Sequence, residues 1–215
     1  MAEKVKCTII SGAPESDYDF LRENTDLNSF TIAADSGYKK LEKIGVIPDL
    51  IVADFDSSEK PKADIKCEVF PIEKEYTDTF NAVRIAVERG FKEIIILGAV
   101  GGRIDHTYSN ILCLDYAAKN GAECVISDRN NRISLIKGEK TFKKDYKWFS
   151  VFAFLGDCKG VSFSGAHYSQ EFFGKKSLDF DMASQVGQSN YIENEECTVT
   201  VKEGTLLLIE SNDYR

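Results

Sequence analysis

An alternation of two kinds of segment in the first 127 residues most limits the folds open to this chain. Short apolar runs rich in β-branched residues are separated by longer stretches with helical periodicity, three of which end at a glycine. Strand–helix alternation favours right-handed crossovers and a mainly parallel sheet with helices on both faces. The expected strands are 5–10, 30–34, 50–53, 67–70, 93–97 and 123–127, and the expected helices end at Gly45, Gly90 and Gly121.

The pattern changes from residue 128 onward. Strand-like composition with little helical periodicity characterises five segments: RISLIKG, TFKKDYKWFSVFAFLG, GVSFSGAHYS, ECTVTVKEG and TLLLIES. A long loop is expected over GKKSLDFDMASQVGQSN. We therefore predict two domains: residues 1–127 form a Rossmann-like α/β domain, and residues 128–215 form an all-β sandwich.

Composition excludes some classes of function. The 215 residues carry a formal net charge of −8 with a pI of about 5.0, so a basic nucleic-acid-binding surface is not expected. No apolar stretch approaches the ~18 residues of a membrane span, and the first residues lack a secretory signal pattern, so we expect neither a membrane partner nor export. The six cysteines are scattered without a C-x-x-C pair, which favours a reducing, cytoplasmic setting.

Acidic residues directly follow several of the predicted strands. In open parallel sheets ligands bind beyond the carboxyl ends of the strands, so these acids are expected at one edge of the sheet. Carboxylates gathered there repel one another unless a cation lies among them, and Mg²⁺ is a hard cation that binds carboxylate oxygens. In extended chain Asp54 and Asp56 point the same way and can face one ion, with Asp78 completing the protein's share. Asp35 also belongs to these acids, and it follows the second predicted strand with Ser36 beside it.

Each of these residues has a structural interpretation when taken alone. The Asp-Ser-Gly at 35–37 is a common turn and helix start, and Thr77 and Asp78 are typical of an N-cap and a first helical turn. An Asp-x-Asp pair in a loop is usually solvated. Their shared position at strand ends is what favours the functional interpretation.

A glycine-rich loop follows the expected strand 93–97 and leads into the next helix. Glycines there let backbone N–H groups approach a phosphate at a helix N-terminus, and the planar guanidinium of Arg103 suits phosphate oxygens. The loop matches neither the P-loop nor the G-x-G-x-x-G pattern, and a tight crossover turn is the alternative explanation for its glycines. Three roles are open to Asp105, namely orienting the arginine, capping the helix and binding a metal-bound water, whereas His106 is expected to be structural. The glycines are Gly98, Gly101 and Gly102.

Five segments occur in an order that resembles the thiamine pyrophosphokinase family: ADSG, PDLIVADFDSS, EKEYTDTFNAV, LGAVGGRIDHTYSNI and, late in the chain, GQSN. The resemblance spans nearly the whole chain, including the change to a β-rich second half. It implies transfer of the pyrophosphoryl group of ATP to the hydroxyl of thiamine, giving thiamine diphosphate and AMP. It also implies a Mg²⁺-dependent homodimer with an α/β nucleotide-binding domain and a β-sandwich domain, and thiamine at the interface between subunits.

The resemblance implies a role for each residue that matches a family motif. Asp54, Asp56 and Asp78 take the positions of acids that bind Mg²⁺ and the ATP phosphates. Arg103 and Asp105 take positions associated with the active site. The remaining matches are Asp35 and Ser36 in the nucleotide pocket, Asn110 at the end of the glycine-loop motif, and Ser189 and Asn190 at the thiamine site.

The sequence also departs from the family's usual pattern. Ala53 and Ser36 each stand where the family often has glycine, and Glu75 stands where the segment before residue 78 usually has aspartate. Asp105 and Asp78 are alternatives for accepting the hydroxyl proton. Two other functions stay open: a pyrophosphokinase acting on a pterin-like alcohol, with the same phosphate machinery, and a nucleotide-sensing dimer without catalysis.

Overall fold

The apolar runs of the N-terminal half form parallel strands, as their composition predicts. The computed structural model describes residues 6–14, 17–54, 65–69, 71 and 75–213, and divides into an N-terminal unit, 1–129, and a C-terminal unit, 130–215. The strands of the N-terminal unit are β1 (Lys6–Ile10), β2 (Phe30–Ala34), β3 (Leu50–Ala53), β4 (Cys67–Val69), β5 (Glu93–Leu97) and β6 (Glu123–Ser127).

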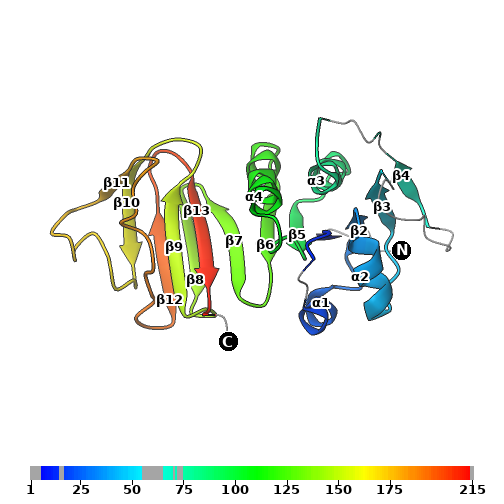
Figure 1. Cartoon of the computed structure of the whole chain (residues 1–215). Helices are drawn as coiled ribbons and strands as arrows, with labels where there is room; N and C mark the ends of the chain where they lie inside the picture. Colours follow the sequence, from blue (N-terminus) through cyan, green and yellow to red (C-terminus); the bar gives the residue numbers. More distant parts are fainter. Residues whose placement is uncertain (1–5, 15–16, 55–64, 70, 72–74, 214–215) are drawn as a thin grey trace. The chain divides into compact units, whose positions relative to one another are not determined.

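Among the described residues, four helices alternate with these strands: the three that the periodicity predicts, and a short one in the polar segment after the first strand. Figure 1 shows two of them on one side of the parallel strands and two on the other. Three helices stop at the glycines predicted to end them, and Gly45, Gly90 and Gly121 all have positive φ angles, of 76°, 86° and 73°. The helices are α1 (Tyr18–Asn24) and α2 (Gly37–Ile44) on one side, and α3 (Asp78–Glu88) and α4 (Ile104–Lys119) on the other.

The order of the strands in this unit is β4-β3-β2-β1-β5-β6. The chain therefore moves outward from β1 to β4 and then returns to place β5 on the opposite side of β1. The connections leaving β1 and β5 pass to opposite faces of the sheet, which leaves a crevice between them at the carboxyl ends of the strands.

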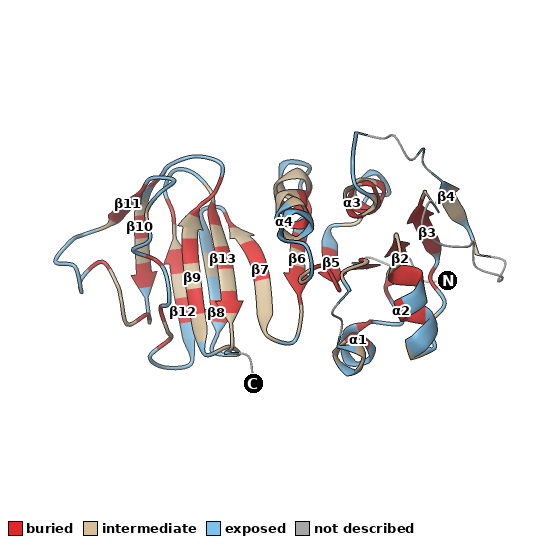
Figure 2. Cartoon of the chain, in the orientation of Figure 1, coloured by how far each residue is buried: buried red, intermediate tan, exposed pale blue. Residues whose placement is uncertain are grey.

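The central strands of the N-terminal unit are buried along almost their whole length (Figure 2). Continuous burial is typical of a parallel sheet covered by helices on both faces. One apolar cluster joins the strands to α1 and α2, and includes Ile10, Leu21, Ala33, Leu41, Ile51 and Leu97. This packing fixes the strand ends from which the candidate site is built.

The C-terminal unit contains antiparallel strands in two sets, ordered β7-β13-β9 and β11-β10-β12-β8. Both sets contribute residues to one apolar core, among them Phe149, Val151, Val161 and Phe180. The chain thus combines a mainly parallel sheet with a second, antiparallel sheet. The strands are β7 (Asn131–Ile136), β8 (Glu139–Lys143), β9 (Trp148–Ala153), β10 (Cys158–Ser164), β11 (Leu178–Phe180), β12 (Glu196–Thr200) and β13 (Leu206–Ser211).

Two details of the C-terminal unit correct the sequence-based prediction. The segment TFKKDYKWFSVFAFLG is divided between β8 and β9, because its polar KDYK stretch forms a turn. The expected long loop contains the short strand β11, in which Leu178 and Phe180 are buried and Asp179 is exposed. Three alternating residues are too few to stand out against a loop-like composition.

All six cysteines are free thiols, and five of them are buried. Burial raises the pKa of the Cys7 thiol to about 12, which keeps it protonated and unreactive. Among the described residues, no helix has the length and apolar character needed to span a membrane.

Gly37 opens α2 in close contact with the end of β1. A Cβ atom at this position would lie 2.0 Å from the carbonyl oxygen of Ile10, so any side chain forces the backbone to move. The absence of a Cβ therefore sets the approach of α2 to β1. That approach brings Lys40, one turn later, within reach of the loop after β1.

We predict that Gly37→Ala lowers the free energy of unfolding by about 2 kcal/mol or more, because overpacking against a backbone atom cannot be relieved by a rotamer change. Urea denaturation of the purified variant measures this loss. Lys39→Ala, at an exposed position on the same helix, serves as the control and should stay within about 0.5 kcal/mol of wild type. Equal stability of the two variants would contradict the packing argument.

Candidate active site

A cavity of about 440 Å³ lies at the carboxyl ends of β1, β2, β3 and β5. Its lining comes from the loops that follow these strands and from the first turns of α3 and α4. This is the crevice at which the strand order reverses, and its volume is in the range of small-ligand sites. The lining consists of 11–14, Asp35, Asp54, 77–79, Ala99, 101–103, His106 and Asn110.

Three of the predicted acids line this cavity, two of them from strand ends and one from the start of a helix. Asp35 follows β2, Asp54 follows β3, and Asp78 begins α3. Asp35 has a φ angle of 53°, a left-handed conformation that is uncommon for any residue except glycine and that is often found at functional sites. Asp56, the partner of Asp54 in the predicted pair, lies outside the described residues.

The N-terminus of α3 is held against the end of β1. The Thr77 hydroxyl oxygen caps the helix by accepting a hydrogen bond from the Phe80 N–H at 3.2 Å. The buried hydroxyls of Ser11 and Thr79 are hydrogen-bonded to each other at 2.7 Å. Asp78 is thereby presented in the first helical turn, where the helix dipole stabilises a negative charge.

The glycine loop after β5 packs against the loop after β1. Gly102 has a φ angle of 65°, and a Cβ atom at this position would lie 2.6 Å from the Pro14 ring. At the end of the loop, the Asn110 side chain donates a hydrogen bond to the Ala99 carbonyl at 2.8 Å and is buried. The two loops therefore form one continuous wall of the cavity.

Arg103 forms the N-cap of α4 and reaches the cavity from its exposed rim. Its guanidinium binds Asp105 at two points, with Nε–Oδ1 and Nη2–Oδ2 distances of 3.1 and 2.5 Å. These hydrogen bonds lower the pKa of the Asp105 carboxyl. Asp105 therefore holds Arg103 by a forked interaction, which agrees with one of the three roles considered for it.

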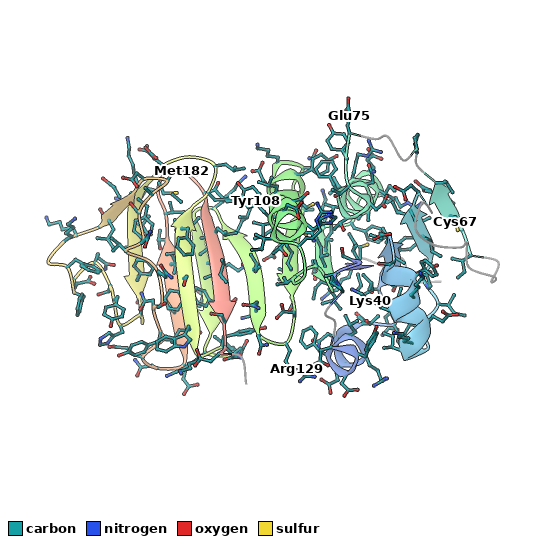
Figure 3. The ribbon with its side chains drawn as sticks, viewed as in Figure 1. Lys40, Cys67, Glu75, Tyr108, Arg129 and Met182 are labelled. Carbon is teal, nitrogen blue, oxygen red and sulfur yellow. The ribbon has the colours of Figure 1, made fainter. Side chains whose placement is uncertain are left out.

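Some of the predicted residues do not line the cavity. Ser36 and Gly98 lie beside it, and the Gly98 carbonyl accepts a hydrogen bond from the Ala13 N–H at 3.0 Å. Asp105 is also absent from the lining, and its carboxylate is bonded to Arg103, which lines the cavity. Glu75 is exposed and lies outside the lining (Figure 3).

Ser189 and Asn190, predicted to bind thiamine, lie in the C-terminal unit. Ser189 has a φ angle of 55°, so its backbone is left-handed, as at Asp35 and Leu155. Asn190 is 1 % exposed, and its side chain is bonded to backbone groups of Tyr168 and Tyr191 at 2.9–3.0 Å. In this structure Asn190 shapes the segment around it, and direct thiamine contact by its side chain stays a prediction.

Sequence reasoning missed several residues of the site. The Ser-Gly-Ala-Pro at 11–14 follows the first predicted strand directly, so the strand-end rule applied to the acids would have found it. His106 lines the cavity, although it was expected to be structural. Lys40 is 6 % exposed, and its ammonium donates hydrogen bonds to the carbonyls of Ser11 and Gly98 at 2.6 and 3.3 Å.

Residues 21–126 match the model of the family described as "Thiamin pyrophosphokinase, catalytic domain". The match runs from within α1 to within β6 and includes the cavity lining except residues 11–14. Along nearly its whole length the chain is similar to the thiamine pyrophosphokinase family.

Similarity to individual members of the family extends beyond this region. A protein of Bacillus subtilis (strain 168) named thiamine pyrophosphokinase is 28 % identical over 214 residues, which cover 95 % of this chain and 98 % of that protein. A crystal structure of thiamine pyrophosphokinase from Bacillus subtilis has a TM-score of 0.85 at 25 % identity, covering 97 % of this chain and all of the other. One from Geobacillus thermodenitrificans has a TM-score of 0.83 at 25 % identity, covering 97 % and 98 % of the two chains.

Lys40 gives the site a distinctive response to pH. Burial lowers the pKa of its ammonium from 10.5 to about 8, although the nearby Asp35 carboxylate acts in the opposite direction. Between these two values the unfolded chain binds the proton more strongly than the folded chain does. The contribution of Lys40 to the free energy of unfolding therefore rises as the pH rises from about 8 towards 10.5.

We predict that the stability of wild type relative to Lys40→Met rises by about 2 kcal/mol between about pH 7.5 and pH 10. Other titrating groups are shared by the two proteins and cancel in the difference. Urea denaturation of both proteins across this range provides the measurement. A difference that is flat or falls with pH would show that the ammonium is not held in a desolvated site.

Proposed function

We propose that the chain is a thiamine pyrophosphokinase, which transfers the pyrophosphoryl group of ATP to the hydroxyl of thiamine and yields thiamine diphosphate and AMP. The observation that best supports this proposal is the cavity at the strand ends, which Asp35, Asp54 and Asp78 line together with the glycine loop and Arg103. The similarity to the family indicates the substrates, because ATP is the co-substrate of this family. The acids and the arginine supply groups suited to polyphosphate chemistry.

The proposal assigns a Rossmann-like nucleotide-binding domain to the predicted residues 1–127 and a thiamine-binding, dimerising β-sandwich to 128–215. Support for the first comes from the reversal of strand order between β1 and β5, beside which the cavity lies. Support for the second comes from the single apolar core that both antiparallel sets share.

Magnesium belongs to the proposal as the cofactor. Asp54 and Asp78 offer hard carboxylate oxygens to the same cavity, which matches the donor preference of this ion. No group of three His, Cys, Asp or Glu side chains within the described residues is arranged to hold a metal by itself. Mg²⁺ usually takes few protein carboxylates and completes its shell with phosphates and water. Asp54, Asp56 and Asp78 are assigned to hold the ion, which when bound would offset the negative charge of the phosphates.

In the proposed reaction, an in-line displacement at phosphorus, each of these residues has a separate role. The thiamine hydroxyl attacks the β-phosphorus of ATP, and AMP leaves. Arg103 binds phosphate oxygens and stabilises the charge that develops on them, while Asp105 fixes its orientation. The hydrogen bonds from Arg103 lower the pKa of the Asp105 carboxyl, which makes it a weaker base, and Asp78 and Asp105 remain the two alternatives for accepting the hydroxyl proton. Asp35 and Ser36, the glycines at 98, 101 and 102, and Asn110 are assigned to the nucleotide pocket.

Thiamine binding is assigned to the segment that holds Ser189 and Asn190. The left-handed backbone at Ser189 and the buried amide of Asn190 give this segment a defined shape. The proposal includes a homodimer in which thiamine lies between subunits, in the cytoplasm, where the six free cysteines would stay reduced. Sedimentation equilibrium tests the dimer.

An assay with ATP, Mg²⁺ and thiamine tests the reaction itself. We expect AMP and thiamine diphosphate to appear in equal amounts, with no ADP, as followed by chromatography of the nucleotides and of the thiamine esters. Activity with a pterin alcohol alone would replace thiamine with another substrate. ATP binding without turnover on either alcohol would point to a nucleotide sensor instead.

We predict that Asp54→Ala lowers kcat by at least about 100-fold, because a carboxylate facing the polyphosphate and its cation is lost. The circular dichroism spectrum and melting temperature should stay close to those of wild type, since Asp54 lies at a strand end and not in the apolar core. Asp19→Ala, which removes an exposed carboxylate on α1, is the matched control and should retain wild-type kcat. A fully active Asp54→Ala variant would contradict the assignment.

A further inference from the structure

Lys40 is a buried cation that none of the roles assigned above uses. It lies in the middle of α2, and its side chain (Figure 3) extends to the ends of two strands. Its ammonium donates to the carbonyl of Ser11, directly after β1, and to the carbonyl of Gly98, directly after β5. These are the two strands between which the strand order reverses.

The two carbonyls determine where the neighbouring N–H groups point. In a planar trans peptide, the C=O of one residue and the N–H of the next point in opposite directions. Because the carbonyls of Ser11 and Gly98 are directed at the ammonium, the N–H groups of Gly12 and Ala99 are directed away from it. Both of these residues line the cavity.

The N–H groups of Gly12 and Ala99 are available to a ligand. Within the described part of the chain, neither of them donates a hydrogen bond to a protein atom. A Cβ atom at Gly12 would lie 2.6 Å from the Ser36 hydroxyl and 2.7 Å from the Asp35 carboxylate, so glycine lets the loop after β1 pack closely against the end of β2. Backbone N–H groups at strand ends of this kind bind anions, and the nearby ammonium adds a positive charge.

We propose that Lys40 is a positioning residue for the polyphosphate of the nucleotide: it holds the carbonyls of Ser11 and Gly98 so that the N–H groups of Gly12 and Ala99 bind phosphate oxygens. This inference rests on the proposed function, because the nucleotide is the co-substrate named there. It adds a specific means by which the uncharged residues 11–14, after β1, take part in binding. Lys40 itself does not contact the reacting atoms.

The burial of Lys40 is consistent with this role. An ammonium in a desolvated position opposes folding, whereas a methionine of similar length would fill the same volume without that penalty. Burial lowers the pKa of Lys40 to about 8, so the group is still mostly protonated near neutral pH. An anion bound in the cavity would favour the charged form further. The unfavourable burial is thus compensated when the anion binds.

Titration calorimetry on Lys40→Met tests the proposal, with Lys39→Met on the exposed neighbouring position as the matched control. The probes are a non-hydrolysable ATP analogue, inorganic triphosphate and thiamine. We expect Kd to rise about tenfold for both triphosphates in Lys40→Met, which corresponds to about 1.4 kcal/mol. Thiamine affinity should change less than about twofold, and Lys39→Met should bind all three ligands as wild type does.

Two results would overturn the proposal: unchanged triphosphate affinity in Lys40→Met, or an equal loss of affinity for triphosphate and thiamine, which indicates general loosening. If the variant does not fold, NMR of the wild-type protein decides instead. Addition of inorganic triphosphate should shift the amide proton signals of Gly12 and Ala99 downfield in a saturable manner, and unchanged signals would overturn the proposal.

The outcome is separable from that of the proposed function. If triphosphate affinity depends on Lys40 but the wild-type protein does not convert thiamine, this inference holds and the proposed function is refuted. If the wild-type protein makes thiamine diphosphate and the Lys40→Met variant binds ATP normally, the proposed function holds and this inference is refuted.

Discussion

Mutual repulsion among carboxylates at one edge of the sheet is the constraint on which the rest of the site depends. Parallel strands bring their carboxyl ends together, so Asp35, Asp54 and Asp78 share one cavity although 43 positions separate the first from the last. Such a cluster is tolerable only if positive charge is near. Arg103 at the rim, the N-termini of α3 and α4, and the ammonium of Lys40 provide it within the described chain. The bound cation of the proposal would complete the balance.

Much of the N-terminal unit could be predicted because its signals are local. Apolar runs, glycines at helix ends and acids directly after strands each depend on a few neighbouring residues, and the structure has the predicted strands and helix ends. The strand-end rule needs only the sequence to bring Asp35, Asp54 and Asp78 to one edge of the sheet. The glycine loop is recognisable for the same reason, since Arg103 and its glycines are close together in the chain.

The parts that sequence could not supply depend on contacts between distant residues. Lys39 and Lys40 are adjacent and chemically identical, yet one is exposed and the other buried, because only the second faces the strand ends. Residues 11–14, which follow β1, carry no charge to mark them as functional. Asn190 illustrates the reverse case, because the resemblance assigns it to thiamine while its amide is bonded to the backbone of its own unit. A residue can therefore belong to a motif because it shapes a site.

The central claim is that the carboxyl edge of the N-terminal sheet binds the polyphosphate and its cation. A crystal structure with a non-hydrolysable ATP analogue, Mg²⁺ and thiamine tests it most directly. We predict phosphate density in the 440 Å³ cavity, beside Arg103, with the metal on Asp54 and Asp78. Phosphates bound elsewhere would contradict the account, for example in the 370 Å³ cavity that Lys6 and Glu93 line at the amino ends of β1 and β5.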